Sequence, residues 1–161
     1  MPVDLSEAIN RFASAVARQR RMTHAGIVIA GASLIEAHLE RALTRTMQPL
    51  SKKLHERVFE SPASPLGTFA SKILIARALG VVSHQTFEQL ETLRNLRNAF
   101  PHTEQVINLH SPKITPFLTA IQATGVSAIA PAQAFLLFIT GIADQLDRYL
   151  EGLGKGSSAA P

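Results

Sequence analysis

The chain has no cysteine among its 161 residues, which excludes disulfide bonds, thiolate metal sites and cysteine nucleophiles. Tryptophan is also missing, and one tyrosine with eight phenylalanines leaves few aromatic rings. We therefore do not expect a protein that stacks nucleic-acid bases on an aromatic platform. No apolar run reaches the roughly 20 residues that a membrane-spanning helix needs. We expect a cytoplasmic protein that does not enter a membrane.

Positive charge exceeds negative charge only slightly, with 16 lysines and arginines against 12 acidic residues and a formal net charge of +4. This balance permits an acidic partner such as nucleic acid but does not require one. Hydrophobic residues make up 46% of the chain, which provides enough apolar surface for a packed core. The length fits one domain. We predict a single helical domain over residues 1–152 and a flexible tail over residues 153–161.

Apolar residues recur at helical spacing along most of the chain, and convincing strand alternation is absent. The pattern predicts an all-α bundle of about six or seven helices. Gly80 is expected to end one helix in the left-handed region, and Ser83 is expected to cap the next. Leu79 is expected to share a buried face with Phe69. The expected helices cover residues 4–16, 23–46, 51–59, 66–79, 83–100, a short stretch from 112, and a long stretch from 131.

The most informative segment is residues 94–102, with the sequence Arg-Asn-Leu-Arg-Asn-Ala-Phe-Pro-His. On an ideal helix Arg97 and His102 would lie about 140° apart around the axis. Pro101 cannot donate to the carbonyl group of Arg97, so the helix should kink or end there and let His102 leave the helical register. Arg97 would then stabilise phosphate charge, His102 would act as general acid or base, and Asn98 would orient the substrate. This interpretation predicts a phosphodiester-cleaving site.

A structural role for the same residues is the alternative. In that case Arg97 pairs with a carboxylate and His102 caps the broken helix. Glu36 and Glu40 lie four residues apart, so they share one face of the predicted helix 23–46. They are candidate binding residues together with Arg94, because either glutamate can pair with Arg97 or Arg94. The spacing alone leaves both interpretations open.

Metal, cofactor and direct DNA binding have less support. The six histidines show no paired ligand spacing, so we expect no metal site and no cofactor. An alanine and a turn glycine at helix-turn-helix spacing precede the predicted helix 83–100, where Gln85, Gln89 and Arg94 could reach bases. However, that helix carries an apolar stripe, as a core helix does. We therefore do not expect direct DNA binding.

The segment Arg97-Asn98-Ala-Phe-Pro-His102 resembles the Arg-x4–6-His signature of HEPN domains, which are small helical bundles that often dimerise. In the nuclease members of that family the arginine and histidine form a metal-independent RNA-cleaving site across the dimer interface. The resemblance implies a HEPN-like bundle. It also implies an endoribonuclease site at Arg97, Asn98 and His102 if the chain is an enzyme.

A second resemblance covers roughly residues 23–102. The segments ASLIEAHLE (32–40), SPLGTFASKI (64–73) and ARALG (76–80), followed by the arginine motif, are similar to the mannitol operon repressor family. Pro101 departs from the family, which more usually has a small residue there. The resemblance implies a homodimeric regulator of transcription of a carbohydrate-uptake operon, acting through a protein partner of the phosphotransfer type. We expect this non-enzymatic function, with the ribonuclease acting on RNA as the alternative and a DNA-binding repressor as the second alternative.

Overall fold

The computed structural model describes residues 24–100 and 131–156, together with residues 7, 9–11, 112, 115, 116 and 119. The prediction of an all-α fold is confirmed, because the elements found in these residues are all helices. The five helices with defined bounds are α2 (His24–Thr46), α3 (Lys52–Phe59), α4 (Phe69–Ala78), α5 (His84–Ala99) and α7 (Pro131–Gly156). The helices expected at 4–16 and from 112 lie largely outside the described residues.

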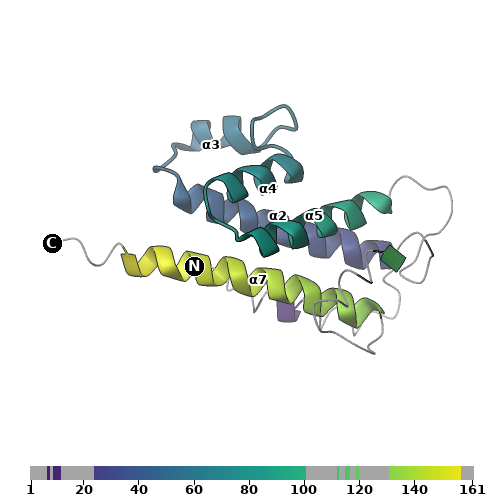
Figure 1. The fold of residues 1–161 in the computed structure, drawn as a ribbon. Helices are drawn as coiled ribbons and strands as arrows, with labels where there is room; N and C mark the ends of the chain where they lie inside the picture. Colours follow the sequence, from purple (N-terminus) through teal and green to yellow (C-terminus); the bar gives the residue numbers. More distant parts are fainter. Residues whose placement is uncertain are drawn as a thin grey trace.

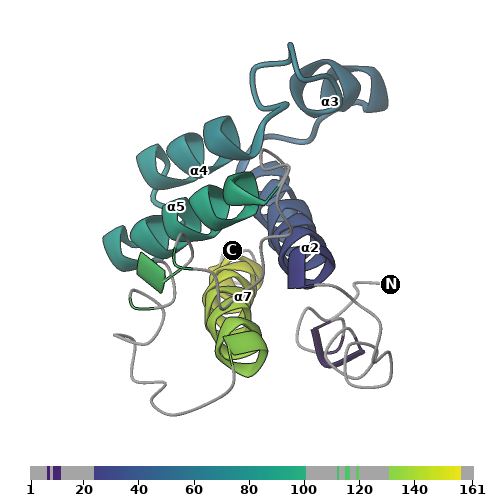
Figure 2. The ribbon, with the colours of Figure 1, turned by 90° about the vertical axis from the view of Figure 1, so that its right-hand side faces the viewer.

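Helix α2 is the centre of the arrangement and contacts α7, α4 and α5. Figures 1 and 2 show α2 and α7 lying alongside each other, while α4 and α5 stack against a different face of α2 and α5 also contacts α7. The hydroxyl groups of Thr46 and Tyr149 are 3.0 Å apart, and Gly31 faces Phe135, so α2 and α7 run in the same direction. Helix α3 lies at the edge of the bundle, beyond α4 in Figure 2.

The interface between α2 and α7 is apolar and closely packed. Gly31 brings the two helices together, because a Cβ atom at this position would lie 2.8 Å from Cε1 of Phe135. Burying a large apolar side chain such as that of Phe135 stabilises the folded protein by about 1.5–3 kcal/mol relative to leaving it exposed to water. The fully buried side chains in this layer include Ile35, Leu39 and Leu43 from α2 and Phe135, Ile139, Ile142 and Leu146 from α7.

The turn between α4 and α5 confirms the predicted role of Gly80, which has a positive φ of 71°. The amide of Gly80 donates to the backbone carbonyl group of Arg77, and the amide of Val81 donates to the carbonyl group of Ala76. These two hydrogen bonds form a Schellman motif. The prediction that Leu79 is buried is wrong, because its side chain is 49% exposed. Leu79 is the last residue before the left-handed turn, and Val81 enters the core after it.

Helix α4 begins at Phe69, three residues later than predicted from the spacing. Thr68 caps it by accepting from the amide of Ser71, while the Ser71 hydroxyl faces back to the amide of Thr68. The preceding loop requires glycine at position 67, since a Cβ atom there would lie 1.7 Å from the carbonyl oxygen of Ser61. The predicted cap at Ser83 is confirmed, because its hydroxyl accepts from the amide of Thr86.

The last helix extends further than the predicted domain boundary. Helix α7 begins at Pro131 as expected, but it ends at Gly156 and not at residue 152. Within this extension the Leu153 side chain is partly buried. Residues 157–161 of the predicted tail lie outside the described residues. None of the helices in the described ranges is long and apolar enough to cross a membrane.

Candidate functional site

An open cleft of about 470 Å³ lies between the middle of α2, the start of α4 and the second half of α5. Four of the six residues singled out from the sequence line it, namely Glu36, Arg94, Arg97 and Asn98. Glu40 lies one turn further along α2 and faces a different opening. His102 and Pro101 lie outside the described residues, so the pairing of Arg97 with His102 stays a prediction. The other residues that line the cleft are Ile29, Gly67, Thr68, Phe69 and Ala70.

Arg97 is held by contacts with two other helices. Its Nη1 atom donates to Oε2 of Glu36 at 2.7 Å, and its Cζ atom lies 6.0 Å from the centre of the Phe69 ring. These contacts are a charge-assisted hydrogen bond and a cation–π interaction. The Arg97 side chain remains 32% exposed, so the guanidinium borders the cleft. Its charge is therefore balanced by a carboxylate, as the structural interpretation of the motif requires.

Lys72 completes this arrangement, although the sequence interpretation gave it no role. Its Nζ atom lies 3.1 Å from Oε1 of Glu36 and 2.9 Å from Oε2 of Glu40, and the side chain is only 6% exposed. Burial by itself lowers the pKa of Lys72, but the hydrogen bonds to Glu40 and Glu36 and the charges of both carboxylates raise it above its ordinary value of 10.5. Lys72 is therefore charged at neutral pH.

The sequence did contain a signal for Lys72. On α4 this lysine stands three residues after Phe69 and four before Ala76, so it shares their buried face. A lysine on the apolar face of a short helix predicts a buried ammonium group, which needs carboxylate partners. Glu36 and Glu40, on one face of α2, are the carboxylates that meet this need.

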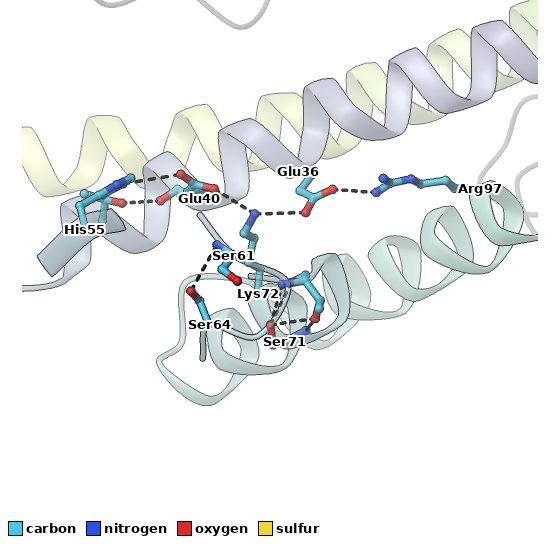
Figure 3. Close-up of polar contacts among 10 residues, drawn as sticks. Glu36, Glu40, His55, Ser61, Ser64, Ser71, Lys72 and Arg97 are labelled. Atoms are coloured by element: carbon cyan, nitrogen blue, oxygen red, sulfur yellow. Dashed lines mark hydrogen bonds and ion pairs between the residues drawn. The ribbon is translucent and has the colours of Figure 1, made fainter. Parts of the chain in front are cut away.

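The charged contacts continue from Glu40 to His55 on α3. The Nε2 atom of His55 lies 3.6 Å from Oε1 of Glu40, and the imidazole ring packs 4.8 Å from the ring of Phe59. Figure 3 shows the resulting row along α2: Arg97, Glu36, Lys72, Glu40 and His55. This row, which we call the ionic row, links the cleft at Arg97 to a groove of about 300 Å³ between α2 and α3. Within the row, the cations Arg97 and Lys72 balance the carboxylates Glu36 and Glu40.

Arg94 does not pair with either glutamate of α2. Its Nη2 atom lies 2.7 Å from Oε2 of Glu91, one turn earlier on α5. This partner is at i−3 on the same helix, where side chains of opposite charge meet readily. Arg94 and the exposed Asn98 nevertheless line the cleft beside Arg97. Three polar side chains of α5 therefore face one opening.

The first turn of α4 forms the opposite wall of the cleft. The amides of Phe69 and Ala70, its first two residues, have no acceptor within the helix. Gly67 adds no side chain, and Ile29 and Phe69 supply apolar surface. The cleft therefore combines hydrogen-bond donors, from guanidinium groups, a side-chain amide and backbone N–H groups, with an apolar surface. Such a site favours a ligand that joins an anionic group to a short apolar part.

The residues proposed to reach DNA bases lie in three different environments. The Oε1 atom of Gln89 accepts from Nε2 of Gln145 on α7 at 3.4 Å, and Arg94 is paired with Glu91. Of the three residues, only Gln85 is exposed and has a side chain that makes no hydrogen bond or ion pair with the other described residues. Helix α5 therefore presents one face to the bundle and offers few free donors for base recognition. The described residues also hold no cluster of histidine and carboxylate side chains suited to a metal ion.

Comparison with known proteins gives one informative result. No protein-family model matches the chain, and no curated protein matches it. A chain from the X-ray structure of the MtlR–HPr complex from Escherichia coli has a similar fold, with a TM-score of 0.70 and 14% sequence identity. The match covers 86% of this chain and 97% of that chain. The two proteins therefore share a helical fold over nearly their full lengths.

Proposed function

We propose that the protein is a non-enzymatic regulator that binds a partner protein of the phosphotransfer type and thereby controls transcription of a carbohydrate-uptake operon. The observation that carries this proposal is the shared fold with a chain of the MtlR–HPr complex. The motifs at residues 32–40, 64–73 and 76–80, which resemble the mannitol operon repressor family, favour the same function. These motifs lie on α2, on α4 and in the turns that flank α4, and the shared fold covers 86% of this chain.

The state of Arg97 also supports binding over catalysis. A ribonuclease would use this arginine to stabilise negative charge that develops on a phosphate. Here the guanidinium contacts Glu36 at 2.7 Å, so several phosphates of an RNA could reach Arg97 only beside a carboxylate that repels them. Lys72 fixes that carboxylate from the other side at 3.1 Å. This arrangement supports a structural and recognition role for the ionic row.

Calorimetric titration of HPr from Escherichia coli into the purified full chain tests the proposal. We expect saturable binding with a defined stoichiometry, and co-elution of the two proteins in size-exclusion chromatography. A second small acidic protein of similar mass is the matched control and should give no saturable heat. The absence of binding to HPr would contradict the proposed partner.

The second candidate is a HEPN-type ribonuclease, favoured by the fact that Arg97 and Asn98 share one open cleft. RNA cleavage in the presence of a chelator, compared between the wild type and the His102→Ala variant, separates the two functions. The proposed function predicts no cleavage by either protein. Cleavage by the wild type that the variant loses would replace the regulator with the nuclease.

Two further expectations have simple tests. Direct DNA binding would retain an operator fragment at low salt and lose it as the salt concentration rises, and we expect no such retention. The homodimer implied by the family resemblance predicts twice the mass of the 17.4 kDa chain in sedimentation equilibrium. A mass of one chain would contradict the dimer without affecting the binding of a partner.

A further inference from the structure

The carboxylate of Glu36 has two cationic partners that differ in their access to solvent. Lys72 contacts Oε1 at 3.1 Å from a side chain that is 6% exposed. Arg97 contacts Oε2 at 2.7 Å from a side chain that is 32% exposed. One partner is therefore enclosed by the bundle, and the other borders the open cleft; Figure 3 shows the two cations on either side of the Glu36 carboxylate.

This difference determines which ion pair can be exchanged. If Arg97 turns away from Glu36, the carboxylate keeps its contact with Lys72, so no charge is left buried without a partner. If Lys72 were removed, Glu36 would keep only Arg97, and Glu40 would keep only His55 at 3.6 Å. Arg97 is thus the cation that can change partners at low cost.

The surroundings of Arg97 suit one acidic side chain. Arg94 and Asn98 offer further donors in the same cleft, and Phe69 and Ala70, the first two residues of α4, also line it. Ile29, which is exposed, and Phe69, which is largely buried but lines the cleft, offer apolar surface to the methylene groups that carry a carboxylate. We infer that the cleft receives an aspartate or glutamate side chain of the partner protein, whose carboxylate replaces Glu36 on Arg97 while Lys72 retains Glu36. This inference rests on the proposed function.

The charges of the cleft favour a single carboxylate over a nucleic acid. Glu36 shows that a carboxylate fits the guanidinium of Arg97 at hydrogen-bond distance. The incoming side chain adds a single negative charge, while Lys72 continues to neutralise Glu36. An RNA backbone would bring several phosphates close to Glu36 and Glu91, and both carboxylates would repel it. The ligand class is therefore the acidic side chain of a protein.

A nuclear magnetic resonance titration with glutarate, a small dicarboxylate used as the probe, tests the chemistry of the cleft. We expect saturable shifts of the Arg97 side-chain Nε–Hε signal and of the backbone amides of Phe69 and Ala70. The Arg97→Gln variant should bind glutarate at least about tenfold more weakly, because it loses a charge-assisted hydrogen bond. Arg77→Gln, at an exposed arginine in the last turn of α4, is the matched control and should bind like the wild type.

A second variant, Lys72→Met, tests whether Arg97 exchanges Glu36 for the incoming carboxylate. In Lys72→Met, Arg97 becomes the sole strong partner of Glu36, so glutarate must compete with a carboxylate that cannot be released. We expect weaker glutarate binding with the same cleft signals shifting. Equal binding by Lys72→Met and the wild type, in a protein that remains folded by circular dichroism, would overturn the exchange.

Three outcomes separate this inference from the proposed function. Glutarate shifts that persist in Arg97→Gln, or stronger binding of inorganic phosphate or a short RNA at the cleft, would overturn the carboxylate site. HPr binding that is unchanged in Arg97→Gln would leave the proposed function intact and overturn the inference. Glutarate binding at Arg97 without any HPr binding would support the carboxylate site and overturn the proposed function.

Discussion

The two faces of helix α2 differ sharply in chemistry. The face toward α7 is apolar, and Gly31 lets the Phe135 ring approach the backbone. The face toward α4 and α5 carries Glu36 and Glu40, which pair with Lys72, and Glu36 also pairs with Arg97. One helix thus serves as the centre of a dry core and as the base of an ionic row that reaches two openings of the surface.

The difference indicates how stability and binding are divided. A close-packed apolar interface has one low-energy arrangement, so it holds the helices in place. Ion pairs that border solvent contribute little net stability but can be exchanged for pairs with a partner. We therefore expect changes on the α7 face to affect unfolding, and changes at the cleft end of the ionic row to affect binding.

Truncation of Phe135 should have the largest effect on stability. Its side chain is completely buried between α2 and α7, so Phe135→Ala leaves a cavity. We expect the free energy of unfolding to fall by about 3–5 kcal/mol, as measured by urea denaturation. A loss below about 1 kcal/mol would mean that the α7 face is not the source of stability.

Removal of the buried cation should have the next largest effect. Lys72→Met leaves Glu36 and Glu40 with only their outer partners, and we expect a loss of about 2 kcal/mol because both carboxylates retain some exposure. The double variant Lys72→Met/Glu40→Gln should recover part of this loss, since one unpaired charge is gone. Urea denaturation of both proteins checks the comparison, and an equal loss in both would contradict it.

A glycine pair offers a matched test of close packing. Gly31→Ala places a Cβ atom 2.8 Å from the Phe135 ring, and we expect a net loss of about 1 kcal/mol after the gain in helix propensity. Gly141→Ala, also within a helix, meets nothing within 4 Å. It should stabilise the protein by roughly 0.5–1 kcal/mol in thermal unfolding. Stabilisation by both variants would show that α2 and α7 are less closely packed than described.

The smallest expected effect is the change with pH of the contribution that Lys72 makes to the free energy of unfolding. The pKa of Lys72 is raised in the folded protein, because burial, which lowers the pKa, is outweighed by the hydrogen bonds to Glu40 and Glu36 together with the charges of both carboxylates. Its contribution to stability is therefore complete below the pKa of the unfolded chain and is lost as pH rises through the folded pKa. The difference in unfolding free energy between wild type and Lys72→Met should stay constant from neutral pH to about 9 and shrink above about 10.5. A difference that grows with pH would contradict this.

The helices could be predicted from the sequence because the patterns that define them lie within each helix and its adjoining turns. Apolar spacing identified α2, α5 and α7, and the sequence around Gly80 and Ser83 identified the turn between α4 and α5. The errors have physical causes. The amide of Leu79 still donates to the carbonyl group of Ile75 as in a helix, but the chain turns at Gly80, and Val81 instead of Leu79 enters the core. Thr68 and Ser71 form a reciprocal cap that delays the start of α4.

The site was less predictable, because it depends on contacts between distant helices. The sequence placed Glu36 and Glu40 on one face and suggested Arg97 as a partner, and the pair with Glu36 spans 61 positions of the chain. Spacing could not distinguish Arg97 from Arg94, whose partner Glu91 lies on its own helix. Which arginine reaches α2 is decided by how α5 packs, and this is a tertiary property.

The most direct test of the account is calorimetric binding of HPr to the wild type and to Arg97→Gln, with urea denaturation of the same two samples. The account predicts saturable binding by the wild type and at least about tenfold weaker binding by the variant. It also predicts that the unfolding free energies of the two proteins differ by less than about 1 kcal/mol, because Arg97 lies at the exposed end of the ionic row. Equal affinities, or no binding by the wild type, would contradict it.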